Sequence, residues 1–215
     1  MSLNGGLGQV TVTDVLVDSS LSVGFCLLNK KGSEDFWIVS NHYGSNNFYS
    51  RLVTASGVSA QRNISVAGLN AIPTEYIFRE MKASPDGQMI AGAAYKHYPG
   101  MFGGLFSIFF EVFNFDSQAG VVSNKVKSPG GLYGPSTERH FEFSPDNKLL
   151  YVDDIVVVPG LQPCGFSSSQ LYQYDLCYTD SINFYRHSTL IGIHSFFVHI
   201  PFGALCSSAR INRST

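Results

Sequence analysis

Charged side chains are scarce in this chain of 215 residues, where Asp, Glu, Lys and Arg together make up 14%. That share is well below the roughly one quarter that is usual for globular chains. With 44% hydrophobic residues, it excludes a disordered chain and a coiled coil. The charges also nearly cancel, because 14 basic residues stand against 16 acidic ones and give a net charge of -2. A nucleic-acid partner and a polybasic membrane patch are therefore not expected.

Long apolar runs and clustered cysteines are missing as well. The most apolar late stretch, residues 189–206, is interrupted by His194, His199 and Pro201. It falls short of the ~20 apolar residues of a spanning helix, so no membrane span is expected. The 4 cysteines are far apart in sequence, which supports neither a zinc site nor a disulfide framework. We therefore predict free thiols, no metal, no cofactor, and no signal peptide within this sequence.

Aromatic residues and glycine are abundant, with 17 Phe, 11 Tyr and 21 Gly. This composition suits half-buried strands joined by tight turns and suits helices badly. Ser84-Pro85-Asp86-Gly87 recurs 60 residues later as Ser144-Pro145-Asp146-Asn147, and the aromatic segment that ends at Asp116 recurs 59 residues later in the one that ends at Asp175. Pro presets φ and Gly or Asn accepts a positive φ, so each Ser-Pro-Asp motif predicts a tight turn between two strands.

Each copy of the repeat is expected to form four antiparallel strands, as in one blade of a β-propeller. In a more degenerate first copy, residues 36–39 take the place of residues 149–152. Fourth strands are expected at segments such as 121–127 and 182–190. The predicted fold is all-β, an incomplete β-propeller of about three four-stranded antiparallel blades plus flanking strands. The blades are expected at about 23–68, 77–128 and 138–193, with a leading strand at 10–17 and a trailing strand from 202.

These turns, together with Asp35–Val39, Ser45–Tyr49 and Leu171–Leu176, resemble a known family. They are similar to the WD40-like propeller region of large secreted bacterial proteins that end in a gliding-motility-associated C-terminal domain. The resemblance runs from about residue 32 to residue 205. It implies a secreted or cell-surface protein, exported by the type IX route, whose propeller is a non-catalytic binding or scaffold module for a protein or glycan ligand. It implies no catalytic residues.

The end of the chain departs from that pattern. After residue 205 the family would continue into another Pro-Asp-Gly turn, whereas residues 206–215 have the composition of an irregular tail. We therefore take 1–205 as a partial propeller and hypothesise that the tail comes from truncation or a shifted reading frame. Translating the coding DNA in the other two frames tests the shift, and the idea fails if neither restores a hairpin. An incomplete ring exposes strand edges, so self-association through them is expected.

The candidate binding residues lie in or directly beside the segments that join second and third strands, at 41–46, 96–104 and 153–169. In an up-and-down sheet these segments share the rim opposite the Pro-Asp-Gly turns, and they are rich in polar and aromatic residues, as binding loops tend to be. A ligand is predicted on that rim. The candidates are His42, Tyr43, Asn46, Tyr95, His97, Tyr98, Asp153 and Asp154.

A propeller hydrolase of the lactonase type is the alternative interpretation. It would hold a divalent cation in the central channel, and only Asp153, Asp154, His42 and Asn46 could be nominated as ligands. Ca²⁺ takes roughly six to eight oxygen ligands, and no Asp-rich loop accompanies the Asp153-Asp154 pair. Alternating aromatic residues on the third strands are expected to pack between blades and not to form a stacking platform.

Overall fold

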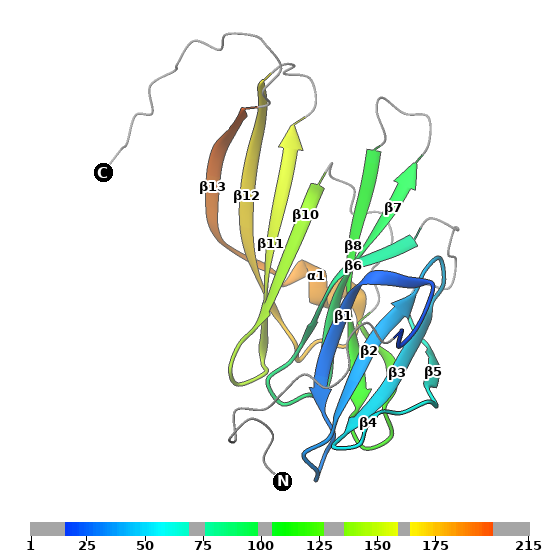
Figure 1. Ribbon diagram of the computed structural model, residues 1–215. Helices are drawn as coiled ribbons and strands as arrows, with labels where there is room; N and C mark the ends of the chain where they lie inside the picture. The colour runs from blue at the N-terminus through cyan, green and yellow to red at the C-terminus, as the bar shows by residue number, and fades with distance from the viewer. Residues whose placement is uncertain (1–15, 69–75, 99–104, 127–135, 159–163, 200–215) are drawn as a thin grey trace, which may run out of the picture.

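The structure, a computed structural model, describes residues 16–68, 76–98, 105–126, 136–158 and 164–199, which form three antiparallel sheets (Figure 1). The all-β prediction is thus confirmed. The first sheet contains β1 (Leu21–Asn29), β2 (Phe36–His42), β3 (Asn47–Thr54), β4 (Gly57–Val58) and β5 (Asn63–Val66), with β4 and β5 both pairing with β3. The second contains β6 (Tyr76–Ala83), β7 (Met89–Tyr98), β8 (Leu105–Asp116) and β9 (Val121–Val126). The third contains β10 (Ser136–Phe143), β11 (Leu149–Val158), β12 (Cys164–Asp175) and β13 (Thr189–His199).

The β6–β7 turn and the β10–β11 turn have the same hydrogen-bond pattern. In the second sheet the Ser84 hydroxyl donates to Asp86 at 2.6 Å and accepts from the Met89 amide at 2.9 Å. In the third, Ser144 makes the corresponding bonds to Asp146 at 2.6 Å and from Leu149 at 2.9 Å. Gly87 and Asn147 have positive φ values of 67° and 60°. Both predicted turns are confirmed, and both aspartates act as turn formers.

The degenerate first copy is shifted by one residue from the predicted alignment. The backbone bond from Lys30 N to Asp35 O, 2.9 Å, closes the β1–β2 turn as the bond from Ser144 N to Leu149 O, 2.9 Å, closes the β10–β11 turn. Asp35 therefore takes the place of Leu149, and the prediction that put residue 36 there was wrong. A shift of one residue exchanges the two faces of a strand. Trp37 consequently packs in the core between the first and second sheets.

The three first strands, β1, β6 and β10, lie side by side in the middle of the molecule, with β5 and β13 toward its outer edges (Figure 1). The gap between β1 and β6 is narrow, because a Cβ on Gly24 would lie 3.1 Å from backbone atoms of Arg79 and Glu80. Between β6 and β10 the turns themselves touch, since the Asp86 amide donates to the Asn147 side chain at 3.2 Å. The two Pro-Asp turns thus occupy adjacent corners of neighbouring sheets.

The second sheet is buried on both faces. Toward the first sheet it presents Ile90 and Phe113, and the Phe113 ring lies 4.8 Å from that of Phe48. Toward the third it presents Ala91 and Phe110, and the Phe110 ring lies 5.0 Å from that of Tyr174. Phe113, Phe115 and Tyr174 therefore pack between sheets, as expected, whereas the Phe109 side chain lies outside the described part of the structure.

Trp37 connects the first sheet to the β8–β9 turn, where Asn63 of β5 also donates to the Ala119 carbonyl at 2.7 Å. The Trp37 indole N–H donates to the Ser117 carbonyl at 3.0 Å, and its ring fills the space beside Gly120, where a Cβ would lie 2.7 Å from ring atoms. Gly120 has a φ of 71°, which favours glycine. The indole thus fills the space between the first and second sheets at the end where the β8–β9 turn lies.

Two predicted strands are not found as expected. Residues 182–190 were predicted as one strand, but α1 (Ser181–Arg186) precedes β13. Asp180 caps this helix by accepting from the Asn183 amide at 2.9 Å, and Phe184 is fully buried, so capping and burial outweigh strand propensity. Residues 16 and 17 form no strand, and the rest of the predicted leading strand, like the trailing strand from 202, lies outside the described residues.

Candidate functional site

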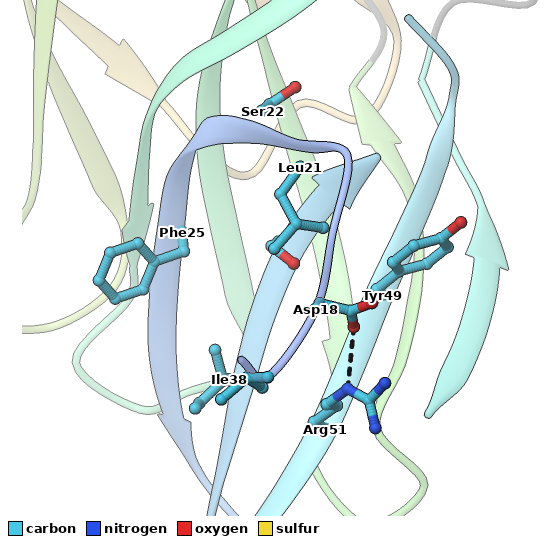
Figure 2. A pocket seen from close by; sticks show the side chains of 9 residues that line it. Asp18, Leu21, Ser22, Phe25, Ile38, Tyr49 and Arg51 are labelled. Carbon is cyan, nitrogen blue, oxygen red and sulfur yellow. Dashed lines mark hydrogen bonds and ion pairs between the residues drawn. The ribbon is translucent and has the colours of Figure 1, made fainter. Parts of the chain in front are cut away.

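A hollow of about 240 Å³ opens on the outer face of the first sheet, the face turned away from the second sheet (Figure 2). Because side chains alternate along a strand, residues next to the core residues Cys26 and Val39 point outward and form its walls. The segment before β1 folds over the sheet and closes one side. The hollow is lined by Val17, Asp18, Leu21, Ser22, Phe25, Ile38, Ser40, Tyr49 and Arg51.

A partly buried ion-pair cluster borders this hollow. Asp18 accepts from Arg51 Nε at 2.8 Å and from Arg62 Nη1 at 2.5 Å, and its side chain is only 6% exposed. The Arg62 guanidinium lies 4.0 Å above the Tyr49 ring, a cation–π contact. Arg51 also donates to the carbonyls of residues 59 and 60 at 3.0 and 2.7 Å. Figure 2 shows the Asp18–Arg51 bond as a dashed line.

The ionisation of Asp18 depends on these partners. Burial raises its pKa, but hydrogen bonds and charges from Arg51, then from Arg62, together outweigh burial and hold the pKa below its ordinary value. The carboxylate is thus charged at neutral pH and leaves one net positive charge among the three groups.

The chemistry available in the hollow is that of binding. Its walls are mostly apolar, which suits an aliphatic or aromatic group of a ligand. The hydroxyl of Ser22 donates to Asn41 at 2.9 Å. The Asn41 side-chain amide in turn donates to the carbonyl of Ser45 in the β2–β3 turn at 3.0 Å and to that of Asn47 at the start of β3 at 3.1 Å. Ser22 is therefore engaged in a structural network that fixes the strand ends.

Three of the residues predicted for the site lie together: His42 ends β2, and Tyr43 and Asn46 lie in the β2–β3 turn. His42 Nδ1 is 3.2 Å from the Ser45 hydroxyl, and the His42 ring is 5.3 Å from the Tyr49 ring. The main-chain carbonyl of Asn46 accepts a hydrogen bond from the Ala67 amide at 3.0 Å. Tyr43 is 47% exposed and is the member of this group most open to a ligand.

The other predicted residues belong to strands, which corrects the expectation that they lie in loops. Tyr95, His97 and Tyr98 fall within β7, and Asp153 and Asp154 fall within β11. The strands continue because each residue keeps a partner in the ladder, such as Tyr98 opposite Leu105 and Asp153 opposite Leu171. The half-buried Asp153 side chain accepts a hydrogen bond from the Ser169 hydroxyl. The side chains of the other four residues lie outside the described part of the structure.

The hollow itself was missed by the sequence analysis. Its signal is present in β1, where outward-pointing Phe25 and Leu27 alternate with core-facing Cys26 and Leu28, so that both faces of the strand are apolar. A strand that is apolar on both faces is typical of a sheet covered on both sides. A second, polar hollow of about 610 Å³, also missed, lies on the rim of the Pro-Asp turns between Lys30, Asp86 and Asp116.

No metal or membrane feature emerges from the part of the chain that the structure describes. Within it, no three His, Cys, Asp or Glu side chains gather in a way that could hold a metal ion. The one helix in this part of the chain, α1, is not long and apolar enough to cross a bilayer. Cys26 and Cys177 are free thiols, and burial raises the pKa of Cys26 to about 12.

Comparisons with protein-family models, with curated proteins and with solved structures give no match to this chain.

Proposed function

We propose that this chain is a segment of a WD40-like β-propeller that serves as a non-catalytic recognition or scaffold module of a secreted or cell-surface bacterial protein. The observation that carries the proposal is the arrangement of three similar sheets with their first strands together in the middle and their Pro-Asp turns in contact at one rim. Side-by-side sheets around shared inner strands are what a propeller requires. A protein or glycan ligand is proposed on the opposite rim, at the β2–β3 turn.

The β2–β3 turn has the properties of a recognition loop. Asn41 pins the turn from inside, so Tyr43 stands exposed on a rigid base. An exposed aromatic ring beside His42 and Asn46 offers stacking and hydrogen bonding, the contacts by which proteins bind sugars and peptide side chains.

Binding to defined glycan and peptide arrays tests the proposal. The wild-type chain is expected to retain at least one probe, and Tyr43→Ala to reduce that binding at least tenfold. Ile182→Ala is the matched control, because Ile182 is also exposed but lies on α1. Retention of no probe, or equal retention by Tyr43→Ala, contradicts the proposal.

Hydrolysis is tested separately with a panel of lactones and aryl esters in the presence of Ca²⁺ or Zn²⁺. No described contact favours the lactonase alternative, and turnover at the buffer rate is expected. Metal-dependent turnover that is lost in Asp153→Asn would replace the recognition role with a catalytic one.

A further inference from the structure

The outer face of the first sheet is apolar and uncovered among the described residues. Phe25 and Leu27 of β1 are 61% and 53% exposed, and Ile64 and Val66 of β5 are 57% and 67% exposed. Ile38 lies between these strands and lines the hollow. Apolar patches of this kind mark interaction sites.

The repeat indicates what covers this face. In each sheet a backbone hydrogen bond closes the turn between the first and second strands, and the cross-strand pair three residues beyond that bond occupies an equivalent position. The three pairs are Leu27 with Ile38, Met81 with Gly92, and Phe141 with Val152. In the second and third sheets Met81, Phe141 and Val152 are 6%, 4% and 1% exposed, because the preceding sheet packs on them. By equivalence, the outer face of the first sheet at Leu27 and Ile38 is a position on which another sheet of this kind would pack.

The third sheet has a face that could pack on the outer face of the first sheet. In the first two sheets, the face that packs on the following sheet contains Trp37 and Ala91, each two residues beyond the bond that closes the first turn. The equivalent residue of the third sheet is Tyr151, which faces away from the second sheet together with Leu171 and Asp153. No following sheet packs there among the described residues.

The charges on the two faces are complementary. Arg51, Arg62 and Asp18 leave one positive charge on the outer face of the first sheet, and Asp153 places one negative charge on the outer face of the third. Opposite charges favour this pairing of faces over a contact between two copies of the positive face.

We infer that the outer face of the β1–β5 sheet docks the β10–β13 sheet of a second copy of this chain, so that two copies close a ring. This inference rests on the proposed propeller. The described residues of each copy supply three sheets, so a ring built from them has six, within the range of about four to eight blades that propellers use. A two-fold axis makes the two contacts identical and leaves neither outer face open.

Sedimentation velocity and light scattering of the purified chain test the ring. The wild type is expected at twice the chain mass of 23.5 kDa. Phe25→Glu and Leu171→Glu each place a charge in both contacts, so each variant is expected as a monomer. Ile182→Glu is the control, because Ile182 is as exposed as Phe25, at 61%, but lies on α1, and it is expected to remain a dimer.

Mixing the two variants adds a stricter test. The first sheet of Leu171→Glu and the third sheet of Phe25→Glu are both intact, so the mixture can form one of the two contacts. We expect dimers in the mixture at concentrations where each variant alone is monomeric. Far-ultraviolet circular dichroism and thermal melting verify that both variants fold.

The other outcomes overturn the ring. A monomeric wild type excludes it, an open polymer excludes closure, and a dimer that survives Leu171→Glu but not Phe25→Glu indicates two first sheets face to face. A dimer that survives both variants indicates pairing through a strand edge such as β13. Hydrogen exchange of a monomer distinguishes failure of the dimeric ring from failure of the proposed function. If the amides where β6 meets β10 are protected, the propeller segment stands without the ring. If they are not protected, both the ring and the propeller segment are excluded.

Discussion

At the scale of single residues, two buried serines of the first sheet have opposite effects on stability. Among the described residues, the Ser50 hydroxyl is fully buried without a hydrogen-bond partner, whereas the buried Ser65 hydroxyl accepts from the Val122 amide at 3.0 Å. Ser50→Ala is expected to raise the free energy of unfolding by about 1 kcal/mol, because it removes an unsatisfied polar group. Ser65→Ala is the matched control and is expected to lower it by a similar amount. Urea denaturation measures both, and destabilisation by Ser50→Ala would show that its hydroxyl is satisfied.

The Asp18 cluster makes stability depend on pH. Folding lowers the pKa of Asp18, so the stabilisation is complete above the ordinary pKa of about 4 and is lost as pH falls through the lower folded value. Asp18→Asn is expected to unfold about 1–2 kcal/mol more easily than the wild type at pH 7. The gap is expected to shrink below about pH 4.

Urea titrations between neutral and acidic pH measure that gap. Glu34→Gln removes an exposed carboxylate and controls for net charge, with little expected effect at either pH. A gap that stays constant with pH would contradict a role for the ionised Asp18 carboxylate.

At the scale of elements, the spacing of the inner strands depends on a glycine. Gly24→Ala would place a methyl group 3.1 Å from the backbone of β6, and we expect a loss of about 1–3 kcal/mol as β1 and β6 separate. Gly192 is the control, because it also lies in a strand but has open space around its Cβ position. Gly192→Ala is expected to gain about 0.5–1 kcal/mol. Because Gly192 lies opposite Leu171 on the face proposed to dock a second copy, both changes are measured in the Phe25→Glu background. Equal effects of the two changes on the melting curve would disprove the close approach of β1 and β6.

Local chemistry made several elements predictable from the sequence. Ser84, Asp86 and Gly87 encode their turn through bonds within a few residues, so the pattern alone predicts it. The lengths of β7 and β11 depend on pairing with strands distant in sequence, which a loop-like composition around His97 conceals. The one-residue shift at Phe36 has a similar cause, because only the ladder shows which residue closes the turn.

The candidate site was less predictable than the fold. That Tyr43, His42 and Asn46 lie near one another was predictable because they are almost adjacent in sequence, and their role in binding stays a prediction. The hollow beside Asp18 was not found, since its walls come from the segment before β1 and from three different strands. The ion pairs at its border likewise join Asp18 to Arg51 and Arg62, which follow it by 33 and 44 positions. Such contacts leave no local pattern in a sequence.

At the scale of the whole molecule, the middle sheet is expected to be the most resistant to opening. Opening it exposes two cores, whereas opening either outer sheet exposes one. In hydrogen exchange of the Phe25→Glu variant, amides of β7 and β8 near Ile90 and Phe113 are expected to exchange more slowly than those of β1 and β12. Equal protection in all three sheets would indicate that the molecule opens as a single unit.

The position of Trp37 has a practical consequence. It is the single tryptophan of the chain, and its indole sits where the first sheet meets the β8–β9 turn. Tryptophan emission, excited selectively over the 11 tyrosines, therefore comes from that contact, and its wavelength would register water entry there before the remainder of the protein melts. Detachment of one sheet from its neighbour can thus be followed optically, without an added dye.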